Sequence, residues 1–228
     1  MNIHSAWSFK YFADPQISRG NNAEMNKEVA PQHGKDSRER ILAAARTLFD
    51  HRGFHQTPMA DLAVTAQVSV GQIYRLFKSK EDVISAIVED DARSWNAQLA
   101  QLRKQLDDRK LTIEQVFEHL LLDCVSEHHD GLRFDILAES VRQDRVGDIV
   151  AKMCADIQEI LRYFACVANP ALNDDVLDVA EELLLACLFG IGHRRTSRSK
   201  MAGSQIAKES AHMIVKALRN ITQSAEPA

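Results

Sequence analysis

Cap residues, turn residues and apolar spacing agree along residues 37–82, and this agreement constrains the fold more than any other feature of the chain. Apolar side chains recur at helical spacing up to Phe49, with Ser37 in place as an N-cap. Gly53 follows where a left-handed C-cap costs glycine nothing, and Phe54 stands where an apolar residue packs back onto the helix end. These signals predict a first helix that ends just before Gly53.

A second, shorter helix is predicted directly after this turn. Thr57 is a favoured N-cap, and Pro58 suits the first helical position because its missing N–H would have no partner there. Gln67, Val68 and Ser69 then form a turn of about three residues, which is the length that a helix-turn-helix needs.

A third helix is predicted to open at Ser69. Ser69 and Gln72 have the spacing of a capping box, and Ser79 with Asp82 repeats that pattern before a long fourth helix. The third helix turns Ile73 inward. Its outward residues are Val70, Gly71, Gln72, Tyr74 and Arg75. This arrangement is typical of a helix-turn-helix DNA-binding head.

The pattern stays helical to the end of the chain. Further helices are predicted over 80–106, 112–125, 132–141, 146–168, 174–190 and 204–220. Neither an alternating strand pattern nor an internal repeat is present in the sequence. We therefore expect an all-α fold with about nine helices.

Residues 37–82 resemble the N-terminal domain of the TetR/AcrR family of transcriptional regulators. The matching residues are Ile41, Ala45, Leu48, Phe49, Gly53, Phe54, Thr57, 61–63 and 68–82. Gln67 departs from the family pattern, which has glycine at that turn position. If this residue adopts φ > 0, glutamine costs on the order of 1 kcal/mol, so we interpret the turn as locally strained.

The resemblance implies a three-helix head joined by a long helix to a helical regulatory and dimerisation body. We therefore expect a flexible leader at 1–34, a DNA-binding head at 35–82 and a ligand-binding, dimerising body at 83–228. In the family the last two helices, here 175–189 and 204–220, pair across a two-fold axis. The expected partners are a second copy of the chain and a palindromic double-stranded DNA operator.

The same resemblance implies which residues contact DNA. Thr57 and Lys80 match family positions that touch phosphate. The start of the third helix enters the major groove and offers Ser69, Val70, Gly71, Gln72, Tyr74 and Arg75. The residue types fit these roles, because Gln and Arg make bidentate contacts with adenine and guanine, whereas Tyr, Thr, Ser and Lys suit phosphate. Two alternatives stay open: Tyr74 packs its ring on the first helix, and Arg75 is simply solvated.

The family body also encloses a ligand pocket between its fourth and eighth helices. The candidates to line it are Trp95, Phe117, Leu121, Phe134, Leu137, Met153 and Phe164. For each of them, plain hydrophobic core is the favoured alternative to a ligand contact. The resemblance implies a repressor that a small apolar or aromatic effector releases from its operator.

Charge supports a small DNA-binding face and excludes a protein that coats nucleic acid non-specifically. The head holds eight Lys or Arg against six Asp or Glu, and residues 83–228 hold 17 against 23. No apolar run approaches the roughly 18 residues of a membrane span. The N-terminus lacks the apolar stretch of a secretory signal, so we expect a cytoplasmic protein. Met25 is an alternative start.

The cysteines and histidines do not indicate a metal site or a cofactor. Cys124, Cys154, Cys166 and Cys187 are far apart and lack a C-x₂-C spacing, so we expect buried reduced thiols, with a thiol sensor as the alternative. The segment 128–130, His-His-Asp, is expected to be a solvated helix end. The basic run 193–200 is expected to be a solvated loop, or else a contact with an acidic surface of the partner chain.

The sequence also bears on two other classes of protein. A helical enzyme is disfavoured because the sequence has no G-x-S-x-G, no Gly-rich phosphate loop and no paired metal ligands. A ligand-binding or protein-interaction module without specific DNA binding is favoured by one feature alone, Gln67 in the turn.

Overall fold

The structure, a computed structural model, describes residues 30–126 and 130–221, and all regular secondary structure within these ranges is helical. The elements are α1 (Ala30–Arg52), α2 (Met59–Ala66), α3 (Val70–Leu76), α4 (Lys80–Asp107), α5 (Ile113–Ser126), α6 (Asp130–Arg142), α7 (Asp144–Ala168), α8 (Asp174–Gly192), the 3₁₀ helix η2 (Arg194–Ser197) and α9 (Gly203–Asn220). Nine α-helices in the described ranges confirm the predicted fold class.

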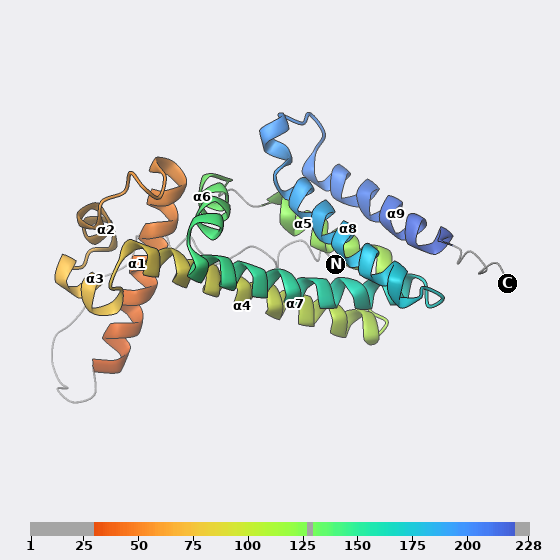
Figure 1. Ribbon diagram of the computed structural model, residues 1–228, viewed down its shortest axis with the longest axis horizontal. Helices are drawn as coiled ribbons and strands as arrows, with labels where there is room; N and C mark the ends of the chain where they lie inside the picture. Colours follow the sequence, from red (N-terminus) through yellow and green to blue (C-terminus); the bar gives the residue numbers. More distant parts are fainter. Residues whose placement is uncertain (1–29, 127–129, 222–228) are drawn as a thin grey trace, which may run out of the picture.

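The molecule is elongated, with the head at one end and the last two helices toward the other (Figure 1). Helices α1, α2 and α3 form the head, and α4 leaves it and runs beside α7. The short helix α6 lies between the head and the body and packs on both α1 and α7. Helix α9 packs mainly on α5, and α8 packs on α5 and α7.

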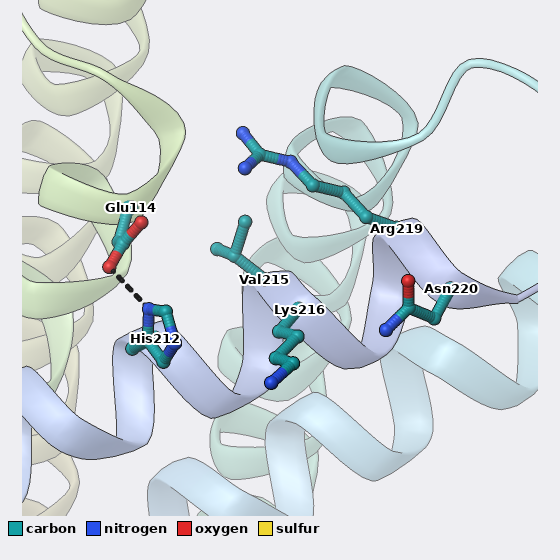
Figure 2. Close-up of a pocket in the computed structure, with 6 residues that line it drawn as sticks. All are labelled: Glu114, His212, Val215, Lys216, Arg219 and Asn220. Carbon is teal, nitrogen blue, oxygen red and sulfur yellow. Dashed lines mark hydrogen bonds and ion pairs between the residues drawn. The ribbon is translucent and has the colours of Figure 1, made fainter.

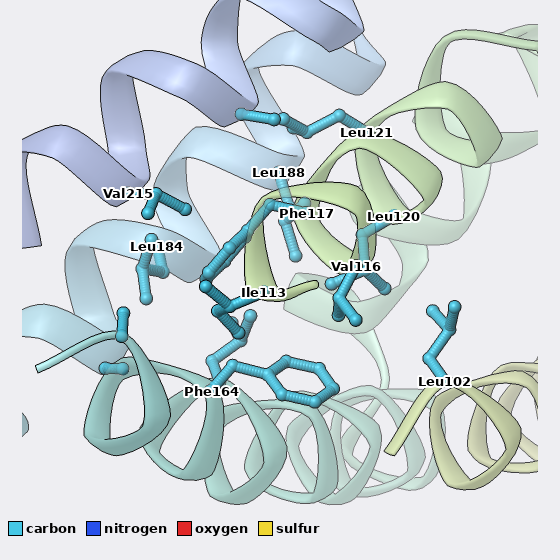
Figure 3. Close-up of a cluster of buried hydrophobic side chains, with 14 of the residues drawn as sticks. Leu102, Ile113, Val116, Phe117, Leu120, Leu121, Phe164, Leu184, Leu188 and Val215 are labelled. Atoms are coloured by element: carbon cyan, nitrogen blue, oxygen red, sulfur yellow. The ribbon is translucent and has the colours of Figure 1, made fainter. Parts of the chain in front are cut away.

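Two hydrophobic clusters hold these helices together. The body cluster joins α4, α5, α7, α8 and α9, and Figure 3 shows Phe117, Phe164, Leu184 and Val215 converging from four of them. The head cluster is centred on α1–α3 and the start of α4, but it also contains Leu132 of α6 and Val146 of α7. Side chains from the body thus complete the core of the head. The predicted domain boundaries at residues 34 and 82 stay a prediction.

Some predicted helix ends are wrong. Helix α1 begins at Ala30, so Ser37 is an interior residue, 2% exposed, and not an N-cap. Helix α2 is preceded by Pro58 as N-cap, with no side-chain cap from Thr57. Helix α9 begins at Gly203 after Ala202. Residues 1–29, in the predicted leader, lie outside the described residues.

Other caps are confirmed by hydrogen bonds. The Ser69 hydroxyl accepts from the Gln72 N–H at 3.1 Å, and the Ser79 hydroxyl accepts from the Asp82 N–H at 3.3 Å. At the start of α5, the Thr112 hydroxyl accepts from the Gln115 N–H, and the Gln115 side chain accepts from the Thr112 N–H in return. These bonds satisfy backbone donors that the helix starts leave without partners.

Gln67 adopts the left-handed conformation, with φ 54° and ψ 46°, so the predicted strained turn is confirmed. Its N–H donates to Val64 O, and the Val68 N–H donates to Ala63 O, which together make a Schellman motif at the end of α2. Arg40 also donates to the Gln67 carbonyl at 3.4 Å. The turn between α2 and α3 is therefore well fixed although its left-handed residue is not glycine.

Replacing Gln67 with glycine is expected to raise the free energy of unfolding by roughly 0.5–1 kcal/mol, because glycine adopts φ > 0 without steric cost. Urea unfolding followed by circular dichroism measures the change. Gln101→Gly is the matched control, since Gln101 is exposed in the middle of α4 and glycine there should cost up to about 1 kcal/mol. Destabilisation by both variants would contradict the idea that the turn is strained.

Within the described residues, none of the helices is both long and apolar enough to cross a bilayer. All four cysteines are free, with Cys124 buried and the other three partly buried. Burial raises the pKa of the Cys124 thiol to about 12, and it also raises that of Cys154, so neither is a reactive thiolate at neutral pH. Residues 128 and 129 of the predicted helix end lie outside the described residues. In the predicted loop 193–200, residues 194–197 form η2.

Candidate nucleic-acid interface

Helix α3 presents an open surface at one end of the molecule. Ser69, Val70, Gly71, Tyr74 and Arg75 are all at least partly exposed, and the Tyr74 side chain is 51% exposed. A Cβ atom added to Gly71 would meet no other atom within 4 Å. The Tyr74 ring is therefore not buried against α1, and that alternative is wrong. The start of α3 is free to approach a large ligand.

The cations of the head are divided between paired and unpaired groups. Four arginines of α1 make ion pairs. The distances are 3.6 Å from Arg38 to Asp90, 3.5 Å from Arg40 to Asp36, 2.7 Å from Arg46 to Asp91 and 2.7 Å from Arg52 to Asp61. By contrast, the exposed side chains of Arg75 and Lys78 have no ion pair among the described residues. The positive charge left for an external anion is thus concentrated at the end of α3.

Gln72 is held by α1. Its side-chain Nε2 donates to the hydroxyl of Ser37 at 2.7 Å. Ser37 is 2% exposed, which makes this bond a link between α3 and α1. Of the predicted capping box, only the bond from the Gln72 N–H to the Ser69 hydroxyl is formed. A bidentate contact from Gln72 to adenine would require the amide to release Ser37.

The two residues predicted to contact phosphate are both engaged inside the protein. Thr57 is fully buried, and its hydroxyl donates to Gly53 O at 2.9 Å. Lys80 Nζ donates to the carbonyls of His55 and Thr57, at 3.0 and 3.2 Å, and lies 4.8 Å from the Phe54 ring centroid. A phosphate contact from Thr57 requires the hydroxyl to turn outward, whereas Lys80 retains a third donor.

A buried carboxylate of α6 lies beside the turn that precedes α2. Glu139 is 2% exposed, and its Oε1 lies 2.9 Å from His55 Nε2 and 3.1 Å from Arg142. Burial by itself would raise the pKa of this carboxyl, but hydrogen bonds from Arg142, Gln143 and His55 outweigh it and hold the pKa below its ordinary value.

A lowered folded-state pKa means that the ionised form of Glu139 favours the folded protein at neutral pH. This contribution is lost as the pH falls through the folded-state pKa, which lies below 4.5. Glu139→Gln is expected to cost about 1–2 kcal/mol of unfolding free energy at pH 7. Urea titrations from pH 7 to pH 3 should show the gap to the unaltered protein closing at the acid end. A gap that is constant with pH would contradict this assignment.

The seven residues predicted to line a ligand pocket are dispersed. Phe117, Leu121 and Phe164 are at most 1% exposed in the body cluster, with the Phe117 and Phe164 ring centroids 6.2 Å apart. Trp95 and Met153 pack at the edge of that cluster. Phe134, at 43% exposure, and the half-buried Leu137 lie on α6. In this conformation the first three are core residues, and their ligand-binding role stays a prediction.

Two clefts on the surface of the described residues are lined by side chains other than those seven. A cleft of about 190 Å³ lies between α5 and α9, where Glu114 faces His212 at 3.0 Å and Lys216 and Arg219 lie beside them (Figure 2). A second, of about 480 Å³, runs along α4 and is lined mainly by polar side chains. Buried ligand sites are mainly apolar and aromatic, so neither cleft matches the predicted effector site.

Sequence reasoning missed the long-range partners of this interface. Ser37 and Gln72 are 35 residues apart, and His55 and Glu139 are 84 residues apart. Local periodicity and capping signals carry no information about such pairs. The only trace in the sequence is a polar residue, Ser37 or Glu139, on a helix face that is otherwise apolar.

Comparisons with known proteins agree with this geometry. A family model described as bacterial regulatory proteins, tetR family, matches residues 41–87. The HTH-type transcriptional regulator UidR of Escherichia coli is 29% identical over 68% of this chain and 79% of its own length. TtgR of Pseudomonas putida, also an HTH-type transcriptional regulator, is 32% identical over 50% of this chain and 59% of its own.

Solved structures share the fold. Reduced NemR of Escherichia coli superposes with a TM-score of 0.60 at 20% identity, covering 84% of this chain and 100% of its own. Salmonella enterica GusR superposes with a TM-score of 0.55 at 22% identity, covering 79% and 95%. The likeness extends over the head and the body together.

Proposed function

We propose that this chain, a member of the TetR family of bacterial regulatory proteins, is a homodimeric repressor that a small effector releases from a palindromic operator. The chain is a helix-turn-helix transcriptional regulator. Regulators of this family are not enzymes, so the predicted absence of catalysis is confirmed by the family.

The observation that carries the proposal is the exposed start of α3. Its N-cap is formed and the preceding turn is fixed, while Tyr74 and Arg75 extend into solvent. We propose major-groove contacts from Ser69, Val70, Gly71, Gln72, Tyr74 and Arg75, with phosphate contacts from Thr57 and Lys80. An exposed guanidinium matches the two acceptors of guanine, and a phenol hydroxyl donates to phosphate.

Dimerisation is proposed through α8 and α9. On α8, Val179 and Leu183 are 67% and 62% exposed and lie one turn apart, and on α9 Met213 is 69% exposed. Apolar side chains that form such a stripe are stabilised when a second copy covers them. A two-fold axis there would present two α3 helices to successive turns of the major groove, about 34–36 Å apart.

The effector is proposed to be small and apolar or aromatic, to act in the cytoplasm, and to bind among Trp95, Phe117 and the other five predicted residues. Because three of these side chains are closed into the core, effector binding would have to rearrange the body cluster. Such a rearrangement would move α4 and the head with it. A coupling free energy of about 1–3 kcal/mol is typical of such linkage.

Random-sequence selection with the purified full chain tests the proposal. A palindromic motif should be enriched, and the protein should bind it far more tightly than unrelated DNA of the same length. An interaction module without specific DNA binding would enrich no motif. The feature that favoured that alternative, Gln67, is accommodated in a complete Schellman motif and no longer favours it.

A further inference from the structure

Two buried polar atoms just after the end of α8 have no hydrogen-bond partner among the described residues. They are Nε2 of His193 and Nε of Arg194. Only two other buried side-chain nitrogen or oxygen atoms in the described ranges share this property, and those two lie far apart in sequence. A buried polar atom without a partner destabilises the protein, so two of them on consecutive residues need a physical explanation. A ligand that supplies the missing hydrogen bond is one such explanation.

The two ring nitrogens of His193 have different roles. Nδ1 lies 2.7 Å from the carbonyl oxygen of Phe189, and because a carbonyl only accepts, Nδ1 carries the proton of this bond. In the neutral ring, Nε2 is then an acceptor with an unused lone pair. The group that matches it is a hydrogen-bond donor, such as a hydroxyl.

Two phenylalanine rings flank the His193 imidazole. The Phe134 ring, on α6, has its centroid 4.9 Å from that of the imidazole, and the Phe189 ring, on α8, lies nearly parallel to it at 6.4 Å. Phe134 is 43% exposed, whereas Phe189 is partly buried. An exposed side chain changes rotamer rapidly, so the Phe134 ring can move aside and pack on the aromatic ring of a ligand.

A guanidinium group lies beside the same end of α8. A Cβ added to Gly192, the residue before His193, would lie 3.6 Å from Arg133 Nη1. Arg133 is partly buried, and burial lowers the pKa of its guanidinium, an effect that Asp91 of α4 opposes. Asp91 also pairs with Arg46 at 2.7 Å, so two arginines share its negative charge. A carboxylate bound to this partly desolvated guanidinium would make a charge-assisted, bidentate contact.

We propose that Arg133, Phe134 and His193 form a subsite for a small aromatic acid that also carries a hydroxyl group. Arg133 binds the carboxylate, the Phe134 ring packs on the aromatic ring, and His193 Nε2 accepts a hydrogen bond from the hydroxyl. This inference rests on the proposed function, because it names the chemical class of the effector. Of the seven residues predicted to line the effector pocket, only Phe134 belongs to the subsite, which lies between α6 and the end of α8.

Calorimetric titration of the purified full chain with the three isomers of hydroxybenzoate tests the subsite without DNA. At least one isomer should bind with a dissociation constant of about 1 mM or below. Its uncharged carboxamide should bind roughly 10-fold more weakly or worse, because the guanidinium loses its charged partner. Benzoate should bind roughly 3–10-fold more weakly, because His193 Nε2 again lacks a donor. The proposal is overturned if no isomer binds, or if the acid and its carboxamide bind alike.

Substitutions assign each preference to one residue. Arg133→Gln should abolish the preference for the acid over the carboxamide, and His193→Phe should abolish the preference for the hydroxyl. Each variant should keep the other preference, which a merely structural role of either residue would not produce. A folded variant that loses both preferences, or neither, contradicts the assignment.

Arg133→Lys keeps the charge without the planar fork, so it should retain only part of the preference for the acid. If circular dichroism shows that Arg133→Gln does not fold, this variant decides the role of the guanidinium, and a preference retained in full overturns it. Arg93→Gln, which removes an exposed cation of α4, and His119→Phe, which removes an exposed imidazole of α5, are the matched controls. Both controls should keep both preferences.

Operator release links the subsite to the proposed function. The isomer that binds most tightly should lower the affinity of the protein for its selected operator. An acid that binds as described but leaves operator affinity unchanged would show that the subsite does not hold the effector. If selection enriches no DNA motif, the proposed function fails, while the titrations still decide whether the subsite exists.

Discussion

Arg75→Ala is expected to lower specific operator affinity by about 10–100-fold, because one bidentate arginine–guanine contact is worth about 1–3 kcal/mol. Arg75 is exposed on α3 with no ion pair among the described residues, so its loss should leave the fold of the head unchanged. Specificity should relax at one base pair of each half-site. Tyr74→Ala should instead weaken binding to all sequences alike, as expected of a phosphate contact.

Gel-shift titrations against the selected operator and its single-base variants measure both effects. Lys152→Ala is the control, since it removes a cation that is 78% exposed on α7 and lies outside α3. Tyr74→Phe removes the hydroxyl and keeps the ring, so it distinguishes their contributions to operator affinity. Unchanged operator affinity in both Arg75→Ala and Tyr74→Ala would show that α3 is not the recognition helix.

Leu183→Glu is expected to turn the dimer into a monomer and to lower operator affinity by roughly 100-fold or more, because two linked heads bind far more tightly than one. The side chain is 62% exposed on α8 and lies in the stripe with Val179. A carboxylate there would lose its hydration on dimerisation without gaining a partner, which costs several kcal/mol.

Sedimentation or light scattering of the purified variant measures its mass, and a gel shift measures the affinity. Val141→Glu is the matched control, because Val141 is 89% exposed on α6, outside the proposed interface. That variant should remain dimeric. A Leu183→Glu protein that remains dimeric and keeps its operator affinity would show that the dimer interface does not include this face of α8.

Much of the head could be predicted because its signals are local. Ser69, Gly53 and Gln67 each act on backbone groups within a few residues, so the cap, the helix end and the left-handed turn follow from the residue types. The predicted N-cap at Ser37 is wrong because α1 begins at Ala30, and Ser37 lies inside that helix, 2% exposed. The sequence alone does not distinguish a serine that caps a helix from a serine inside a helix that hydrogen-bonds a neighbouring helix.

The contacts that individual side chains make in the folded protein could not be predicted in the same way. Thr57 and Lys80 are the residue types that phosphate contacts need, yet here they hold the turn before α2 together. By sequence, Phe117 and Phe164 fit both a ligand pocket and a closed core, with the core favoured, and in the structure their rings pack together in the core. These outcomes depend on packing between segments tens of residues apart, which periodicity and caps do not encode.

The central claim is that two α3 helices, one from each of two identical chains, occupy the major groove of one operator. Guanine methylation interference on the selected operator tests it directly, because a methyl group on N7 blocks only the major groove. We expect two clusters of interfering guanines related by the palindrome and separated by about one helical turn or a multiple of it. A single cluster, or no interference at any major-groove guanine of a bound operator, would contradict the account.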